Sequence, residues 1–571
     1  MRTFARWVVA GLAALAFVAP LKFTTPVVMQ SLVALPGAGE WLALTWPNQL
    51  GVMFAFAAFV WLVIDPDRMQ TRVDWLFVLP LILVLAQLPA LTRSIYPHVS
   101  ADTLMHLATC ALLFYAAAWY ARDGADATRI FGALALAAMV TCLIALKQSA
   151  GGLQETREFA ANLPVSDELR ARMQSNRVFG TFVYPNTLAG FLVVAFAPAM
   201  AWLWVRGRTW VPAVKWLALA FAGGLMLVTL GLTGSRGGFV AFAVMVVTWL
   251  WCLSRRAGVR AAIVAGAMAL ALVAGMVGLG KRGTSSLEAR LDYWRGAVAI
   301  ARDFPAFGTG PGTFGSIYPK YKTADTEEAQ LVHNNYLQMW SDAGVAAFVV
   351  FLALWAVALR DGYRLTKERA GDAAVIAIVP ALAGWVVHGL VDFDLYVPGI
   401  AYPVFALLGT LQGLKEVPHP DVVTERGRSR WLLGAVCLVI AGSILWTQGR
   451  AVAAGAALAR GGAERAIQLA PRDAYYRAAA GGVAGQFGSF DDAARHYRAA
   501  TELDPFRPSY HWRLGLAELS AQASPRQALA ELRQAVELNP TSRTYPRALA
   551  QIEESVRQAR PDLLPSVPPR K

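Results

Sequence analysis

Long apolar runs recur through the first three-quarters of this chain and constrain its fold more than any other feature. A run of about 18 or more apolar residues is long enough for one membrane-crossing helix. The chain is 56% hydrophobic and only 16% charged, a balance that soluble proteins seldom show. We therefore predict an all-α, polytopic helical membrane protein with about 12–13 spans. Thirteen candidate spans lie near 7–23, 41–64, 75–91, 102–120, 130–146, 188–205, 212–232, 237–253, 259–280, 343–359, 373–391, 398–414 and 431–447.

The net charge of +14 comes from Lys and Arg residues scattered over the loops between these spans. No single basic domain gathers them, so the charge favours contact with membrane lipids and not with nucleic acid. If the N-terminus lies in the cytoplasm, every cytoplasmic loop is basic, as the positive-inside rule requires. Arg93 and Arg236 are the exceptions on the other side. An odd number of spans then places the C-terminal region outside the cytoplasm.

The four cysteines and the first apolar run suggest no further chemistry. Cys110, Cys142, Cys252 and Cys437 lie inside apolar runs without metal-ligand spacing. We expect them to be small core residues, and we expect no metal site. Further spans follow the first run directly, so we expect an uncleaved first span and not a cleaved signal peptide.

The spans and loops form a membrane domain over residues 1–448. Two of its extracytoplasmic loops are long, at 147–187 and 281–342. The second is polar, aromatic and punctuated by Gly and Pro, and most candidate residues lie in or beside it. No nucleotide-binding loop, metal cluster or nucleophile elbow has credible spacing. The glycine-rich segment 308–312 contains Pro311, which lacks a backbone donor, so it predicts a tight turn and not a phosphate cradle.

The composition changes after the last span. Residues 449–545 are Ala-rich and charged, and similar segments end at Pro471, Pro505 and Pro540, which are 34 and 35 residues apart. This period is typical of tetratricopeptide-like helical repeats, although an unrelated array of helical hairpins would give a similar pattern. Residues 546–571 form a basic, Pro-rich tail that we expect to be disordered at its end.

Three arginines are candidate ligands for an anionic group. Arg236 lies between Ser235 and two glycines at an outer membrane boundary, where it could bind a ligand or simply reach lipid headgroups. Arg290 and Arg295 lie on a segment of helical pattern, on different faces. Arginine offers a planar fork to phosphate oxygens. Asp292 could instead hold either of them in a surface salt bridge.

The other candidates are a histidine and four polar residues near membrane boundaries. His333 titrates near neutral pH and could accept a proton from a hydroxyl group or bond to a phosphate, although a lone histidine is more often structural. Asn334 follows it directly. Arg177 and Asn186 flank a turn-rich approach to the span at 188–205, and Asp392 stands where the span at 373–391 ends. A structural role is at least as good an explanation for the last three.

Taken in order, these motifs resemble the bacterial O-antigen ligase and O-antigen polymerase family, over roughly residues 1–450. The elements that match are Thr233-Gly-Ser-Arg-Gly-Gly238, Arg290 with Trp294, Phe304-Pro305 with Gly308-Thr-Gly310 and Phe314, His333-Asn-Asn-Tyr-Leu337, and Arg177 with Gly180 and Pro185-Asn186. The C-terminal repeats are an addition that the simplest ligases lack.

The resemblance implies a glycosyltransferase of the C-type architecture that uses no cofactor and no metal. Its donor would be a glycan on undecaprenyl pyrophosphate, at the periplasmic face of the bacterial inner membrane. Arg236 and Arg290 would bind the pyrophosphate and His333 would activate the acceptor hydroxyl. Arg295, Arg177, Asn186, Asn334 and Asp392 would be further substrate-binding residues.

The acceptor stays open at this point. A ligase would use lipid A-core, which we favour, a polymerase would use another lipid-linked repeat unit, and some family members glycosylate proteins. The repeats, which we expect on the periplasmic side, could recruit a protein partner. Two other classes are a transporter gated by its polar loops and a scaffold built on the repeats, but a scaffold leaves Arg236 and His333 unexplained.

Overall fold

The computed structural model describes residues 2–22, 26–28, 74–154, 176–254, 285–325, 328–415 and 449–559, with isolated positions at 158, 256, 258–260, 266, 442, 446 and 447. In these ranges the regular elements are all helices, and the protein is an all-α polytopic membrane protein, as predicted. Among the described residues, seven helices are long and apolar enough to cross a membrane. The expected spans at 41–64, 259–280 and 431–447 lie wholly or almost wholly outside the described residues.

The other expected spans coincide with helices. Several begin at a proline, where the missing N–H is not needed and the fixed φ angle suits the first turn. They are α1 (Arg2–Lys22), α4 (Trp75–Leu85) with the short α5 (Leu88–Thr92), α6 (Pro97–Tyr120), α7 (Gly124–Lys147), α10 (Pro185–Arg206), α11 (Pro212–Thr233), α12 (Arg236–Leu253), α16 (Asn335–Glu368), α17 (Ala373–His388) and α18 (Pro398–Leu414).

Small residues let these helices approach one another closely. Gly409 and Gly413 of α18 lie against the backbone of α6 near Ala117 and Ala118. Close contacts between small residues are a main source of helix association in a membrane, where burying apolar surface gives little advantage. α10 packs between α7 and α17, and α12 packs along α17. The large core that results surrounds α10 and α18, whose side chains are almost all buried.

The two ends of the helix bundle differ. At one end, the Lys415 Nζ lies 2.7 Å from a carboxylate oxygen of Asp74 and 2.7 Å from one of Asp361. This cation joins the start of α4, the second half of α16 and the end of α18. At the other end, the Asn335 amide donates to the Gly389 carbonyl at 2.8 Å, which joins the start of α16 to the end of α17. We call this second end the site end.

The expected loop at 281–342 is largely helical. It contains α14 (Ser285–Asp303) and α15 (Phe314–Tyr321), which pack together through a small second core. We call this core the aromatic cluster; its buried members are Tyr293, Ala297, Ile300, Phe314, Ile317, Tyr318, Ala329 and Val332. The helix α14 has an apolar face and a polar face, and that pattern explains why a polar segment between two spans folds at all.

The glycine-rich segment forms a tight turn, as predicted. Gly308, Gly310 and Gly312 all have positive φ angles, which suit glycine because it has no Cβ. The Gly310 amide donates to the Asp342 carbonyl at 2.8 Å, and the Gly312 amide donates to the Asp342 carboxylate at 2.9 Å. These donors are used within the protein, so the turn is a buried wall against α16 and not an exposed lid.

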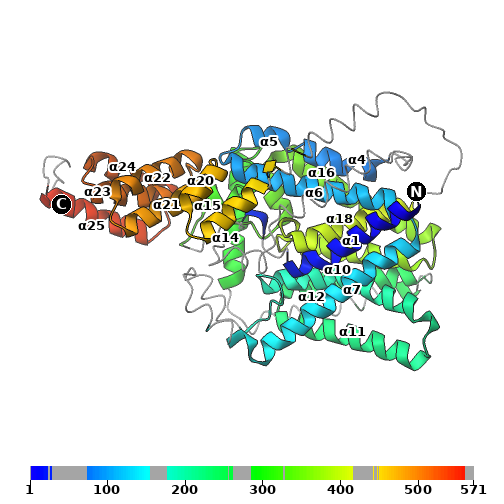
Figure 1. The fold of residues 1–571 in the computed structure, drawn as a ribbon. Coiled ribbons are helices and arrows are strands. Elements are labelled where there is room, and N and C mark those ends of the chain that lie inside the picture. The colour runs from blue at the N-terminus through cyan, green and yellow to red at the C-terminus, as the bar shows by residue number, and fades with distance from the viewer. Residues whose placement is uncertain are drawn as a thin grey trace.

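The C-terminal region is a row of helices that projects from the site end of the bundle, beside α14 and α15 (Figure 1). Its helices α23 and α24 begin 34 and 35 residues after α21 and α22, so the structure contains helical hairpins at the period seen in the sequence. They are α20 (Ala463–Leu469), α21 (Ala474–Gln486), α22 (Phe490–Leu503), α23 (Pro508–Ser520), α24 (Pro525–Leu538) and α25 (Thr544–Ala559). The boundary expected at 545 falls inside α25, because this segment still follows a helical pattern.

A histidine joins the two helices of one repeat hairpin, α23 and α24. His511 Nδ1 lies 2.7 Å from a carboxylate oxygen of Glu531, and its Nε2 lies 2.9 Å from the Pro505 carbonyl oxygen. Burial alone would lower the pKa of His511, but the Glu531 carboxylate and the Pro505 carbonyl raise it above its usual value. The protonated form of His511 is therefore favoured by folding.

Candidate active site

His333 and Asp392 form an ion pair at the site end of the bundle. The Nδ1 atom of His333 lies 3.4 Å from a carboxylate oxygen of Asp392, a distance slightly longer than a good hydrogen bond. The Asp392 side chain is 1% exposed and the His333 side chain is 22% exposed. The pair therefore has a buried anion behind a histidine that still reaches solvent.

The backbone and the ring of His333 are both held in unusual positions. Its φ angle is +55°, in the left-handed region that residues other than glycine rarely adopt. Its ring stacks on Tyr293 at 5.8 Å and meets the edge of Phe393 at 4.6 Å. Strained backbone of this kind persists only where the surrounding structure fixes it, and it is common at functional sites.

The charge on Asp392 is stabilised by its neighbours. Burial alone would raise the pKa of this carboxyl, but His333, the nearby His388 and the positive charge of Arg290 together hold its pKa below the usual value. Asp392 is therefore an anion at neutral pH. A buried anion beside an imidazole favours the protonated imidazole, so His333 is suited to accept a proton.

A second pair of the same type lies directly beside the first. The Nδ1 of His388, the last residue of α17, lies 2.6 Å from a carboxylate oxygen of Asp394, and both side chains are fully buried. Burial raises the pKa of Asp394 to about 6, although the charge of His388 opposes this. One donor atom each from His388, Asp392 and Asp394 lie within 4.8 Å of one another, so this set could hold a metal ion.

Arg236 begins α12, and the next residue brings α12 against the two pairs. A Cβ added to Gly237 would lie 2.5 Å from Cγ2 of Val391 and 4.0 Å from the His388 ring, so glycine alone allows this approach. Arg236 itself is exposed and makes no hydrogen bond or ion pair with another described residue. Among the described residues it is thus a cation without an ionic partner, next to the segment that carries Asp392.

Arg177 and Asn186 hold the backbone that leads into Arg236. The Arg177 guanidinium donates to the Thr233 carbonyl at 2.6 Å and to the Asn186 side-chain oxygen at 2.7 Å. Because Thr233 ends α11, these bonds tie the α11–α12 turn to the start of α10. Arg177 and Asn186 are thus placed to hold Arg236 in position, and they would act on a ligand through Arg236.

Arg290 and Arg295 lie on α14 and differ in their surroundings. Arg290 is half-buried and its charge acts on Asp392, whereas Arg295 is exposed on another face of the helix. Asp292 accepts hydrogen bonds from the Tyr318 hydroxyl at 2.6 Å and from the Thr323 amide at 3.0 Å. Neither arginine forms an ion pair with a described acidic side chain. Of these two arginines, Arg290 is the one whose charge acts on the His333–Asp392 pair.

Asn334 has a structural function. Its side-chain oxygen accepts hydrogen bonds from the amides of Tyr336 and Leu337, at 2.9 and 3.0 Å, and caps the N-terminus of α16. Asp392 likewise faces His333 and is almost inaccessible to solvent. We expected both residues to bind substrate, and that stays a prediction; both also have partners within the protein.

Sequence reasoning missed Tyr293, Phe393 and the His388–Asp394 pair. The pair did have a signal: two carboxylates at 392 and 394 follow an apolar span directly, and ionisable residues at such boundaries are functional candidates by default. The two aromatic residues had none, because only the fold brings α14 and the 389–393 segment to the same histidine.

Residues 221–352 match a protein-family model described as O-antigen ligase. The matched segment extends from α11 into α16, so it contains Arg236, Arg290 and His333. No curated protein matches the chain. The family match supports the O-antigen ligase family and a membrane glycosyltransferase-like role in O-antigen assembly.

Proposed function

We propose that this protein transfers a glycan from undecaprenyl pyrophosphate to an acceptor hydroxyl, with ligation to lipid A-core as the favoured reaction. The observation that carries the proposal is the His333–Asp392 pair, close to the charge of Arg290, at one end of a membrane helix bundle. We place this end at the periplasmic face of the inner membrane, because the positive-inside rule puts the opposite end in the cytoplasm.

In this mechanism His333 acts as the general base. The exposed side of its ring accepts the proton of the acceptor hydroxyl while the acceptor oxygen attacks the anomeric carbon of the donor sugar. The bond between that carbon and the pyrophosphate oxygen breaks, and the lipid pyrophosphate leaves with the electron pair. Asp392 stabilises the imidazolium that forms, so the proton transfer becomes more favourable.

The two arginines act on the leaving group. Negative charge builds on the pyrophosphate as the bond breaks, and fixed cations that face it stabilise the transition state more than the ground state. Arg236 and Arg290 suit this role because neither is neutralised by an acidic side chain within the described residues. The planar fork of a guanidinium group also matches the geometry of phosphate oxygens.

The test is a strain that lacks the gene, complemented with wild type or with His333→Ala, whose carrier lipids are analysed by mass spectrometry. Loss of a ligase leaves long glycans on undecaprenyl pyrophosphate, whereas loss of a polymerase leaves single repeat units there. An unmodified protein acceptor would indicate a protein oligosaccharyltransferase. Unchanged carrier lipids and surface glycans would refute transfer altogether, and a transporter would then be the better explanation.

A chelator separates this mechanism from a metal-dependent one. We expect purified protein to keep its transferase activity after treatment with EDTA, because the described mechanism uses only side chains. Activity that disappears with EDTA and returns with a divalent cation would instead indicate that catalysis needs a metal ion, with His388, Asp392 and Asp394 as its candidate ligands.

A further inference from the structure

The C-terminal repeats touch the membrane domain through one edge. This docking edge consists of three successive inter-repeat loops, at 470–473, 504–507 and 539–543. Their contacts fall on the start of α6, on α15, and on Asp325 and Glu328, respectively. Because the loops follow one another at the repeat period, the stack presents them in a row.

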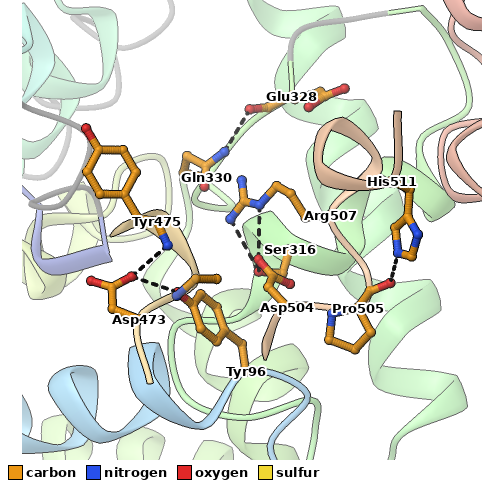
Figure 2. Close-up of polar contacts among 11 residues, drawn as sticks. Tyr96, Ser316, Glu328, Gln330, Asp473, Tyr475, Asp504, Pro505, Arg507 and His511 are labelled. Carbon is orange, nitrogen blue, oxygen red and sulfur yellow. Dashed lines mark hydrogen bonds and ion pairs between the residues drawn. The ribbon is translucent and has the colours of Figure 1, made fainter. Parts of the chain in front are cut away.

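The first loop contacts the start of α6. The Tyr96 hydroxyl donates to a carboxylate oxygen of Asp473 at 3.1 Å and accepts from the Ala474 amide at the same distance (Figure 2). The His98 ring lies 3.6 Å from the other oxygen of Asp473. Asp473 is buried in this contact.

The third loop adds a bond from the Asn539 amide group to Glu328 at 2.7 Å.

The middle loop makes a buried polar contact with α15. The Ser316 hydroxyl donates to a carboxylate oxygen of Asp504 at 3.2 Å, and the Arg507 guanidinium donates to the same oxygen at 3.1 Å (Figure 2). Asp504 is fully buried. A buried carboxylate that lost its partners would be strongly unfavourable, so this network favours a repeat domain that stays docked.

Between Asp504 and Arg507, the Phe506 ring packs against the aromatic cluster of α14 and α15. Within that cluster, Phe314 stacks on Tyr318 at 4.8 Å, and Tyr318 meets Tyr293 edge to face at 5.5 Å. Tyr293 is the ring that stacks on His333. A continuous set of packed side chains therefore extends from Phe506 of the repeats, through the aromatic cluster, to the candidate base.

We propose that the repeats complete the active site, with the 504–507 loop as a positioning element for His333. This inference rests on the proposed function for its catalytic readout. Phe506 supports the aromatic cluster, the cluster fixes the Tyr293 ring, and that ring keeps His333 in its strained backbone conformation. The repeats are thus a fixed wall of the site and not a freely tethered module for recruiting partners.

The test uses the purified full-length protein with Phe506→Ala, compared with Phe506→Leu. We expect kcat to fall about tenfold or more in the alanine variant with little change in the KM for the donor, because small displacements of a catalytic group slow chemistry more than binding. Leucine should restore most of the rate. Phe487→Ala is the matched control, since that ring is 82% exposed on the repeats, away from the docking edge.

A second readout does not depend on transfer. The rate at which diethylpyrocarbonate modifies His333, measured by peptide mass spectrometry, should rise in Phe506→Ala and stay unchanged in Phe487→Ala. If wild type transfers no glycan but this rate still responds to Phe506, the proposed function fails and the positioning role stands. If Phe506→Ala unfolds the repeats, Ser316→Val removes the neighbouring hydrogen bond between α15 and Asp504 of the same loop. Unchanged kcat and unchanged His333 reactivity in a folded variant would overturn the inference.

Discussion

Replacing Asp392 by asparagine keeps the shape of the side chain and removes the negative charge that lies 3.4 Å from His333 Nδ1. Two unit charges at this distance attract by about 5 kcal/mol at an effective dielectric constant of about 20, and by about 1 kcal/mol in water. Asp392 is buried while His333 is 22% exposed, so the attraction lies between these limits. We expect the imidazolium to lose about 3 kcal/mol of stabilisation.

That loss applies only when His333 carries a proton. In our mechanism His333 gains this proton in the transition state and keeps it in the step that follows. A rise of about 3 kcal/mol in the barrier slows a reaction on the order of a hundredfold. We therefore expect kcat of Asp392→Asn to fall by about that factor, while the KM for the lipid-linked donor changes little.

The assay is glycan transfer by purified protein in lipid nanodiscs, with the lipid-linked donor and the acceptor supplied and the product resolved by gel or mass spectrometry. Thermal unfolding of each variant checks that the fold survives the substitution. A folded Asp392→Asn protein whose kcat stays within threefold of wild type would show that the pair does not serve proton transfer, and the mechanism would be refuted.

Three further predictions use the same assay or the same protein. Arg290→Ala should slow transfer about tenfold to a hundredfold, whereas Arg302→Ala, an exposed arginine on the same helix, should not; equal effects would remove Arg290 from the site. Gly237→Val should abolish transfer by pushing α12 away from α17, while Gly224→Val, which has open space around it, should be tolerated; activity in both would contradict the close approach. His511 has a raised pKa in the folded protein, so its stabilising effect is complete below its usual value near 6.5 and is lost as the pH rises through the folded value. The unfolding temperature of wild type should thus drop more between pH 6 and pH 9 than that of His511→Gln, and parallel curves would refute this.

The sequence was sufficient for the helices and for the general location of the site. Apolar runs are a direct consequence of membrane thickness, so α10 and α18 could be placed to within a few residues. The pattern of α14 also separated Arg290 from Arg295. The tetratricopeptide assignment of the repeats stays a prediction, because their helical hairpins would suit either kind of array.

The partners of the site residues could not be predicted in the same way. Asp392 looked like a ligand for substrate, since nothing local reveals that it faces a histidine 59 positions earlier in the chain. Asn334 looked like a binding residue because a helix cap and a ligand contact both need an amide oxygen. The approach of Gly237 to Val391 depends on the packing of α12 along α17, and no single segment encodes it.

The docking edge also sets an order of events during biosynthesis. Tyr96 and Asp473 are 377 positions apart, and the contact between Ser316 and Asp504 spans 188. Such distant contacts form late in folding. Ribosomes release the repeats after the described membrane helices, so on our proposal the wall around His333 is finished only after the repeats have been made and docked. If the proposed transfer reaction and the proposed role of the repeats both hold, a nascent chain that already spans the bilayer stays inactive, and a lipid-linked glycan is protected from premature transfer until assembly is complete.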